Sequence, residues 1–285
     1  MSELDVKEML LCFNQSSDSY QRDAVEKALL HREELTPHLI KIIEAVADNP
    51  LLYSLEQRDA HIYAAVLLAH FEETAAHLPL IRAFSIPEEH LFDIWGDMTT
   101  ETLPAILYRT CGGSMEAIKE LIANRTIDQY VRCAAMEALS YAVAFQPALR
   151  QEVVHFFQGL FTGEEAESDS CYWGNLAATL CDLHPGESME ILRRAHDAGI
   201  IYSGFIAWKD IEDANGKNPE TAMERLRPWV TARMPADVHA YIAWFAGFHR
   251  QELEQPERKS NKQGKKKTGR TKHKAPKKPH KKKRR

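Results

Sequence analysis

The sequence predicts an all-α fold, a superhelix of stacked antiparallel helix pairs, followed by a disordered basic tail. Apolar residues recur at helical spacing along residues 1–255, and no run alternates in the manner of a strand. Helix pairs also recur along the chain: equivalent apolar positions lie 40, 33 and 37 residues apart, at Val66, Ile106, Leu139 and Leu176. Beyond Pro256 almost nothing is apolar, so that segment cannot offset its ordering entropy.

Three helices are predicted between residues 36 and 84. Thr36-Pro37 is typical of an N-cap followed by proline at the first helical position. Asn49-Pro50 ends this helix, because proline disfavours helical geometry in the residue before it. The residues expected to point inward are, helix by helix, Leu39, Ile42, Ile43 and Val46; Ile62, Val66 and Ala69; and Leu78, Ile81 and Phe84.

Six further helical segments follow up to residue 195. The first ends at Gly112-Gly113, and an acidic loop, Gly163–Asp169, precedes the fifth. Their apolar positions are Leu103, Ile106 and Leu107; Met115, Ile118, Leu121 and Ile122; Val131, Ala135, Leu139 and Ala142; Leu149, Val153, Phe156, Phe157 and Leu160; Trp173, Leu176, Ala177 and Leu180; and Met189, Leu192 and Ala195.

A last helix is predicted near Ala236–Arg250, after a loop at Asn215–Pro219. Its apolar stripe consists of Val238, Tyr241, Ile242 and Phe245. We expect this helix to seal the last repeat; a docking surface is the alternative.

One helix carries a more specific pattern, Asp128-x-x-Val131-Arg132-x-x-Ala135-x-x-Ala138-Leu139. This pattern resembles the first helix of HEAT repeats. In that family the small residues let neighbouring helices approach, and the Asp and Arg form a ladder between repeats. The resemblance implies a HEAT-like α-α superhelix over residues 1–255.

The net charge of −5 hides a strong separation of charge. Of the 36 Lys and Arg and the 41 Asp and Glu in the chain, 16 bases and one acid lie in residues 256–285, which leaves 20 bases and 40 acids in residues 1–255. We therefore predict two parts: an acidic helical repeat domain, 1–255, and a disordered Lys/Arg-rich tail, 256–285. Asymmetry of this kind indicates a tail that binds a polyanion.

The tail carries dense positive charge without aromatic residues. This composition suits neutralisation of a phosphate backbone rather than base stacking or sequence reading. RNA, the ribosome or DNA is the expected partner; a solubilising tail, or one folded back on the acidic domain, is the alternative. The residues expected to bind nucleic acid are Lys265, Lys266, Lys267, Arg270, Lys272, Lys274, Lys277, Lys278, Lys281, Lys282, Lys283, Arg284 and Arg285.

The five cysteines are scattered and form no CxxC pair, which predicts neither a zinc site nor a disulfide framework. The first residues are acidic and lack the apolar run of a signal peptide. The apolar stretch Ile62–Ala69 is too short to span a bilayer. We expect a cytoplasmic protein with reduced thiols, without cofactor or membrane contact.

Several motifs stand in a specific order between about Asp5 and Asp213. They are Arg32-Glu33-Glu34-Leu35-Thr36-Pro37, Asp48-Asn49-Pro50, Tyr63 through His70, Gly96-Asp97, Thr100-Glu101-x-Leu103, and Val131-Arg132-x-Ala134-Ala135-x-Glu137-Ala138-Leu139. In order and spacing, these motifs resemble the bacterial family known as domain of unknown function 1186. The resemblance implies mainly the fold, since the family has no settled activity. Many relatives end in a zinc-binding module of the type found at the end of the SecA translocation ATPase. Here no Cys or Cys-His cluster follows Cys181, so zinc is not expected.

No catalytic residue is predicted, but one acidic cluster is a candidate groove. His90, Asp93 and Asp97 lie at helical spacing, with Glu101 one turn on. Such side chains could hold a metal or act as an acid/base pair. The alternative is a solvated face whose acids stabilise helix starts.

Three weaker motifs are better explained without function. Gly264–Thr271 partly matches a phosphate-binding loop but lacks the flanking strand and helix. Asp213–Gly216 mimics part of a calcium loop with two ligands missing, and a helix-joining turn is favoured. Cys171 and Cys181, with His184 nearby, could include a nucleophile, although buried packing is favoured.

The leading functional hypothesis is a non-catalytic interaction scaffold. Its helical-repeat groove would bind a protein partner, and its tail would tether the complex to RNA, ribosome or DNA. One alternative is a HEAT-like nucleic-acid-processing enzyme resembling the DNA glycosylases, which the acidic domain disfavours. The other is a small-molecule enzyme using the region His90–Glu101. The partner and the oligomeric state are not predicted.

Overall fold

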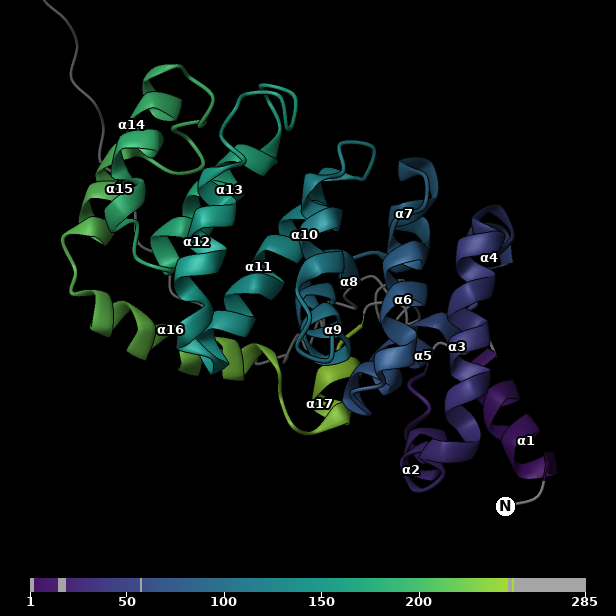
Figure 1. The fold of residues 1–285 in the computed structure, drawn as a ribbon. Helices are drawn as coiled ribbons and strands as arrows, with labels where there is room; N and C mark the ends of the chain where they lie inside the picture. Colours follow the sequence, from purple (N-terminus) through teal and green to yellow (C-terminus); the bar gives the residue numbers. More distant parts are fainter. Residues whose placement is uncertain (1–2, 15–18, 57, 246–247, 249–285) are drawn as a thin grey trace, which may run out of the picture. The chain divides into compact units, whose positions relative to one another are not determined.

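The computed structural model describes residues 3–14, 19–56, 58–245 and 248, and within them the regular elements are helices without any strand. Figure 1 shows these helices in chain order. The α-helices are α1 (Glu3–Asn14), α2 (Arg22–Leu30), α3 (Arg32–Asp48), α4 (Pro50–Glu56), α5 (Ala60–His70), α6 (His77–Phe84), α7 (Glu88–Trp95), α8 (Met98–Glu101), α9 (Leu103–Thr110), α10 (Glu116–Ala123), α11 (Gln129–Phe145), α12 (Arg150–Gln158), α13 (Cys171–Asp182), α14 (Met189–Asp197), α15 (Trp208–Asn215), α16 (Pro219–Arg233) and α17 (Val238–Ile242). Short 3-10 helices are η1 (Thr74–Ala76), η2 (Pro147–Leu149) and η3 (Gly186–Ser188).

A row of helices forms the centre of residues 3–245. Helices α5, α9, α11, α13 and α15 each pack on the next in this order (Figure 1). Helices α3, α10, α12 and α14 pack on members of this row, and α6 packs on both α3 and α9. The six helical segments predicted between residues 103 and 195 are thereby confirmed as α9 to α14.

Helices α16 and α17 form a return segment, residues 219–245, that crosses the row a second time. Helix α16 packs on α11 and α13, and α17 packs on α5, in the first half of the chain (Figure 1). The expectation that the last helix seals the last repeat is therefore wrong. Its apolar residues Val238, Tyr241 and Ile242 are buried as predicted, but against helices about 140 to 220 residues earlier in the chain.

Polar contacts fix the middle of the return segment to α9 and α11. The guanidinium of Arg233 lies 3.4 Å from the carboxylate of Glu137. Arg109 donates hydrogen bonds to the carbonyl oxygens of Met234 and Pro235, each at 3.3 Å. These bonds satisfy carbonyl groups where α16 ends and the chain turns toward α17.

The end of the return segment is fixed to α2 and to the start of α9. The Tyr241 hydroxyl donates to the carbonyl of Thr102 at 3.0 Å. The ring of His239 lies between two partners: Nδ1 is 2.7 Å from the Tyr20 hydroxyl, and Nε2 is 2.9 Å from the carboxylate of Glu26. His239 is itself buried, so these contacts belong to a packed interface.

The return segment explains why α5 is buried on all sides. Every residue from Ala60 to Ala69 is buried, whereas the sequence predicted one apolar face through Ile62, Val66 and Ala69. Helix α3 packs on one side of α5, and α17 packs on another. A helix that is apolar all round is a core helix.

No described helix is both long and apolar enough to cross a membrane.

Two predictions near the N-terminus are wrong in detail. Helix α3 begins at Arg32, and Pro37 lies inside it, because Leu35 extends the buried stripe of Leu39 and Ile43 upstream of the proline. In α6 the predicted inward residue Leu78 is 61% exposed, and its neighbour His77 is buried instead. Nδ1 of His77 lies 2.9 Å from the Thr110 hydroxyl, which holds that face of α6 inward.

His61 places an ionisable ring inside this core. One of its ring nitrogens, Nε2, lies 2.7 Å from the carbonyl oxygen of Ile94, and the ring meets Trp95 edge-on at 5.0 Å. Burial disfavours the imidazolium and lowers the pKa of His61 to about 4, although the carbonyl contact opposes this shift.

We expect His61 to make the protein less stable in mild acid. The His61 ring binds a proton near pH 6.5 in the unfolded chain but only near pH 4 in the folded protein. The free energy of unfolding is therefore highest above pH 6.5 and decreases as the pH falls toward 4. At pH 5 the loss attributable to His61 is about 2 kcal/mol. Urea unfolding of wild type and His61→Gln at pH 7.5 and pH 5 measures it. Equal pH dependence in the two proteins would contradict the assignment.

Candidate functional site: an acidic groove at the helix starts

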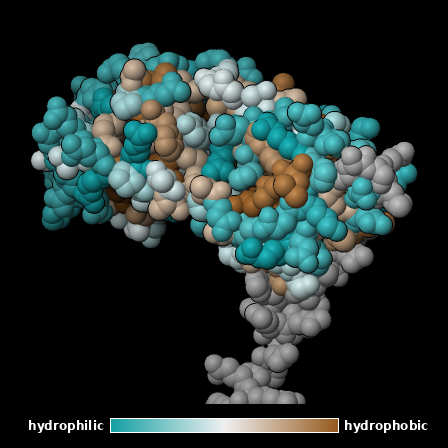
Figure 2. Space-filling view, turned by 90° about the horizontal axis from the view of Figure 1, so that it is seen from below, coloured by the Kyte–Doolittle hydropathy of each residue, from teal (hydrophilic) through white to brown (hydrophobic). Residues whose placement is uncertain are grey.

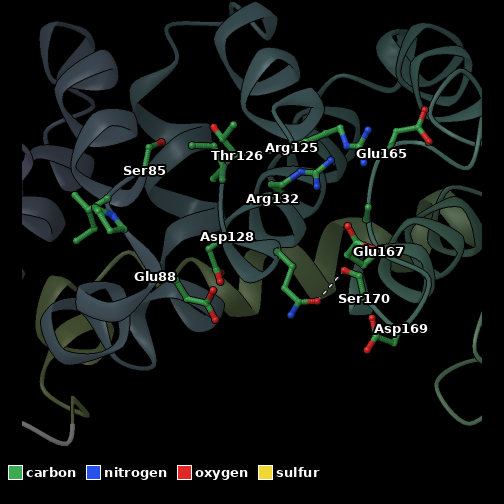
Figure 3. Close-up of a pocket in the computed structure, with 15 residues that line it drawn as sticks. Ser85, Glu88, Arg125, Thr126, Asp128, Arg132, Glu165, Glu167, Asp169 and Ser170 are labelled. Carbon is green, nitrogen blue, oxygen red and sulfur yellow. Dashed lines mark hydrogen bonds between the residues drawn. The ribbon is translucent and has the colours of Figure 1, made fainter.

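Two adjoining cavities lie where α7, α8, α11 and α13 begin. The larger has a volume of about 590 Å³ and is lined by the loops that precede α7, α11 and α13 (Figure 3). The second, about 400 Å³, is lined by α7, α8 and the start of α11, and both cavities include Glu88 and Asp128. We name the two together the acidic groove. Its charged side chains are Glu88, Asp97, Arg125, Asp128, Arg132, Glu165, Glu167 and Asp169.

Negative charge dominates this groove, since six carboxylates face two guanidinium groups. Glu88 and Asp128 approach each other at one end (Figure 3). The carboxylates of Glu88, Glu167 and Asp169 are exposed, and none makes a hydrogen bond or ion pair with another described residue. Such a lining attracts cationic groups and repels phosphate.

Hydrogen bonds to the helix starts fix the groove walls. Asp128 caps α11 by accepting hydrogen bonds from the amides of Tyr130 and Val131, at 2.8 and 3.3 Å. The side-chain oxygen of Gln129 accepts a hydrogen bond from the Ser170 hydroxyl at 2.8 Å (dashed in Figure 3). It also accepts one from the Cys171 amide at 2.9 Å. The starts of α11 and α13 are thereby bound to each other.

Arg132 lines the acidic groove with a buried side chain. It is only 3% exposed, its Nε donates to the carbonyl of Ile122 at 2.8 Å, and its guanidinium lies 4.0 Å from the ring centre of Tyr172. Burial lowers the pKa of Arg132. The expected ladder of Asp128 and Arg132 between repeats is not formed, because Asp128 caps its own helix and Arg132 stacks on an aromatic ring of the next.

The predicted candidate groove is divided between two helices. His90 and Asp93 belong to α7, which ends before Gly96. The backbone φ of Gly96 is +48°, a conformation that glycine adopts at little cost. Asp97 and Glu101 belong to the separate helix α8 and its N-cap. The expected single helical face is therefore wrong.

Of these four residues, only Asp97 lines the acidic groove. Asp93 instead accepts a hydrogen bond from the Ser54 hydroxyl at 3.0 Å. Among the residues that the structure describes, no three His, Cys, Asp or Glu side chains are placed to share a metal ion.

The remaining sequence candidates have structural explanations or lie elsewhere. Burial raises the pKa of Cys181 to about 12, so its thiol stays protonated, and His184 contacts the carbonyl of Lys217 at 3.1 Å. Asp213 lies inside α15 and pairs with Lys209 at 2.6 Å, so the predicted turn at Asp213–Gly216 is wrong except at Gly216, which follows the end of the helix. The thirteen basic tail residues and Gly264–Thr271 lie outside the described residues.

The acidic groove was not predicted, although the sequence carries a feature that indicates it. The loops before α11 and α13 stand at equivalent places in successive helix pairs. Loops at equivalent places gather at one edge of a helical stack. The acidic loop Gly163–Asp169 and the segment Arg125–Asp128 were therefore candidates for a shared surface.

These features define an all-α protein of stacked helices with an acidic groove at one edge. The chain belongs to the family described as "Protein of unknown function (DUF1186)", whose pattern matches residues 4–249. This confirms the predicted family and extends its match beyond Asp213.

Two bacterial relatives are similar to this chain. Each is called an uncharacterized protein, and each is 32% identical over 192 residues, or 67% of this chain. One comes from Chlamydia trachomatis, with 76% of its length covered, and the other from Chlamydia muridarum, with 77% covered. No solved structure matches the chain significantly.

Proposed function

We propose that this protein is a non-catalytic interaction scaffold. Its acidic groove binds a basic segment of a protein partner, and its lysine-rich tail tethers the complex to RNA, ribosome or DNA. The observation that carries the proposal is the separation of charge: 40 acids and 20 bases up to residue 255, against 16 bases and one acid after it.

The proposal includes a HEAT-like superhelix as the framework. Its support is the recurrence of helix pairs, since the equivalent residues Val66, Ile106, Leu139 and Leu176 are all fully buried. Their helices α5, α9, α11 and α13 pack in succession. Stacked pairs of this kind present extended surfaces.

Because the return segment covers one side of the row, the proposed partner-binding surface lies at the edge of the stack. Because α16 and α17 pack on α5, α11 and α13, that side of the row is occupied by the chain itself. The acidic groove, in contrast, is open and carries unpaired carboxylates at Glu88, Glu167 and Asp169. A Lys- or Arg-rich peptide segment is the ligand that this chemistry favours.

Of the two alternatives, the glycosylase-like enzyme requires a basic groove for DNA. The acidic groove has the opposite charge, which does not favour that alternative. A small-molecule enzyme using His90–Glu101 would depend on residues divided between α7 and α8, with only Asp97 in a cavity. Neither alternative gains support from a specific contact.

A peptide-binding measurement tests the groove. We expect Glu88→Gln, Glu167→Gln and Asp169→Asn together to weaken binding of a fluorescent lysine-rich peptide to the full-length protein by roughly tenfold, or about 1.4 kcal/mol. Fluorescence anisotropy at low salt gives the affinity. The loss should shrink as added salt screens the carboxylates.

The matched control replaces exposed carboxylates outside the groove, Glu33→Gln, Glu34→Gln and Glu224→Gln. It removes the same amount of charge from the same chain. An equal loss in both triple variants would mean that net charge, and not the groove, binds the peptide.

A further inference from the structure

Two cysteines from different helices lie side by side, each next in the chain to a residue that lines the acidic groove. The sulfur atoms of Cys133 on α11 and Cys171 on α13 are 3.9 Å apart, and both residues are half-buried. Cys171 follows Ser170, a groove residue, and Cys133 follows Arg132. We propose that Cys133 and Cys171 form a redox-active dithiol that a low-molecular-weight disulfide oxidises to an intramolecular disulfide.

The geometry needs only a small movement to form the bond. A disulfide requires the sulfur atoms at about 2.05 Å, so they must approach by roughly 2 Å. The two helices already pack on each other, and the hydrogen bond from the Cys171 amide to Gln129 joins their starts. A side-chain rotation with a slight shift of α13 supplies the movement.

The two thiols differ in a way that assigns their roles. Cys171 is the first residue of α13, where the helix dipole favours a negative charge. The two sulfur atoms are within hydrogen-bonding distance at 3.9 Å, and this contact lowers the pKa of Cys171. The same contact, together with burial, raises the pKa of Cys133. Cys171 is therefore the attacking thiolate and Cys133 the resolving thiol.

With oxidised glutathione as the oxidant, the reaction balances in two steps. The Cys171 thiolate attacks one sulfur of glutathione disulfide, forming a mixed disulfide and releasing one glutathione thiolate, which takes up a proton. Cys133 loses its proton and attacks the sulfur of Cys171, which expels the second glutathione. The protein dithiol loses two electrons and two protons, and one glutathione disulfide becomes two glutathione thiols.

The disulfide would link α11 and α13 next to two residues that line the acidic groove, Arg132 and Ser170. It would close a loop of 38 residues and restrict the unfolded chain. It would also move the Cys171 amide, which is bound to a groove residue. The dithiol rests on the sulfur geometry alone and does not require the proposed scaffold function.

The test oxidises the full-length protein in glutathione buffers of increasing disulfide content, alkylates the remaining thiols and maps the peptides by mass spectrometry. We expect two of the five cysteines to escape alkylation together, as a linked pair of Cys133 and Cys171 peptides. The Tm should rise by several degrees on oxidation and return on reduction.

Single variants separate the two roles. In Cys133→Ser, Cys171 should retain glutathione as a mixed disulfide, whereas in Cys171→Ser, Cys133 should stay reduced. Cys181→Ser, on the same helix α13, is the matched control and should keep the linked pair. Phenylarsine oxide, which binds paired thiols, should bind wild type at one equivalent and neither single variant. Full alkylation of Cys133 and Cys171 in wild type, or a linked pair involving another cysteine, would overturn the proposal.

Discussion

Replacing the eight lysines of the three tail runs by glutamine is expected to weaken binding of a short single-stranded RNA by about 100-fold or more at low salt. The runs are Lys265–Lys267, Lys277–Lys278 and Lys281–Lys283. Each lysine that neutralises a phosphate releases a counterion, so the slope of log K against log salt should fall in magnitude by about 0.7 per lost contact. Fluorescence anisotropy across a salt series measures both quantities.

A control variant replaces two lysines of the acidic domain, Lys209→Gln and Lys217→Gln. Because the acidic domain carries twice as many acids as bases, these changes should leave RNA affinity and its salt slope nearly unaltered. Retention of full affinity by the tail variant would show that the RNA-binding surface lies elsewhere.

Truncating Tyr241 to alanine is expected to cost about 3–5 kcal/mol of unfolding free energy, the range for removing a large buried aromatic side chain. Tyr241 is 4% exposed and lies at the end of the return segment. The guanidinium of Arg109 lies 5.5 Å from the centre of its ring, and its hydroxyl binds the Thr102 carbonyl. Tyr241→Phe, which removes only that hydrogen bond, should cost about 1 kcal/mol.

Urea unfolding of these variants tests whether the return segment is part of the core. Tyr202→Ala is the matched control, because Tyr202 is 72% exposed and its loss should change stability by no more than about 0.5 kcal/mol. If Tyr241→Ala were as mild as Tyr202→Ala, the return segment would contribute little to the fold.

The part of the fold predicted best is the central series of helices. Helices α9 to α14 were predicted because their apolar residues are periodic and their ends carry glycine or polar caps. Helix α16 was missed, since only Leu226 and Val230 are buried in it and Pro228 lies inside it. Asn218-Pro219 was interpreted as a loop, yet the Asn218 side chain caps α16 by accepting from the Glu220 amide at 2.8 Å.

The path of the return segment could not be predicted from the sequence. It depends on contacts such as Tyr20 with His239, which are 219 positions apart. Local periodicity carries no information on which distant helix an apolar stripe will meet. The sequence correctly predicted that Val238, Tyr241 and Ile242 are buried, but not which helices they pack against.

The candidate site was predictable only in part. Asp97 was named and lines the acidic groove, but His90, Asp93 and Glu101 do not, because Gly96 separates α7 from α8. The proximity of Cys133 and Cys171 was not predicted, although the spacing of the repeat is consistent with it. Both lie near the starts of successive row helices, about one repeat apart, where adjacent helices bring equivalent positions together.

Affinity capture with full-length wild type, the tail glutamine variant and the groove triple variant tests the separation of the two binding functions most directly. The capture is made from an extract of the producing organism, with and without nuclease, across a salt series. We predict that the tail variant loses nucleic acid but keeps a protein partner that survives nuclease, and that the groove variant loses this partner but keeps nucleic acid. Loss of both ligands in both variants, or nucleic acid retained in full by the tail variant, would contradict the account.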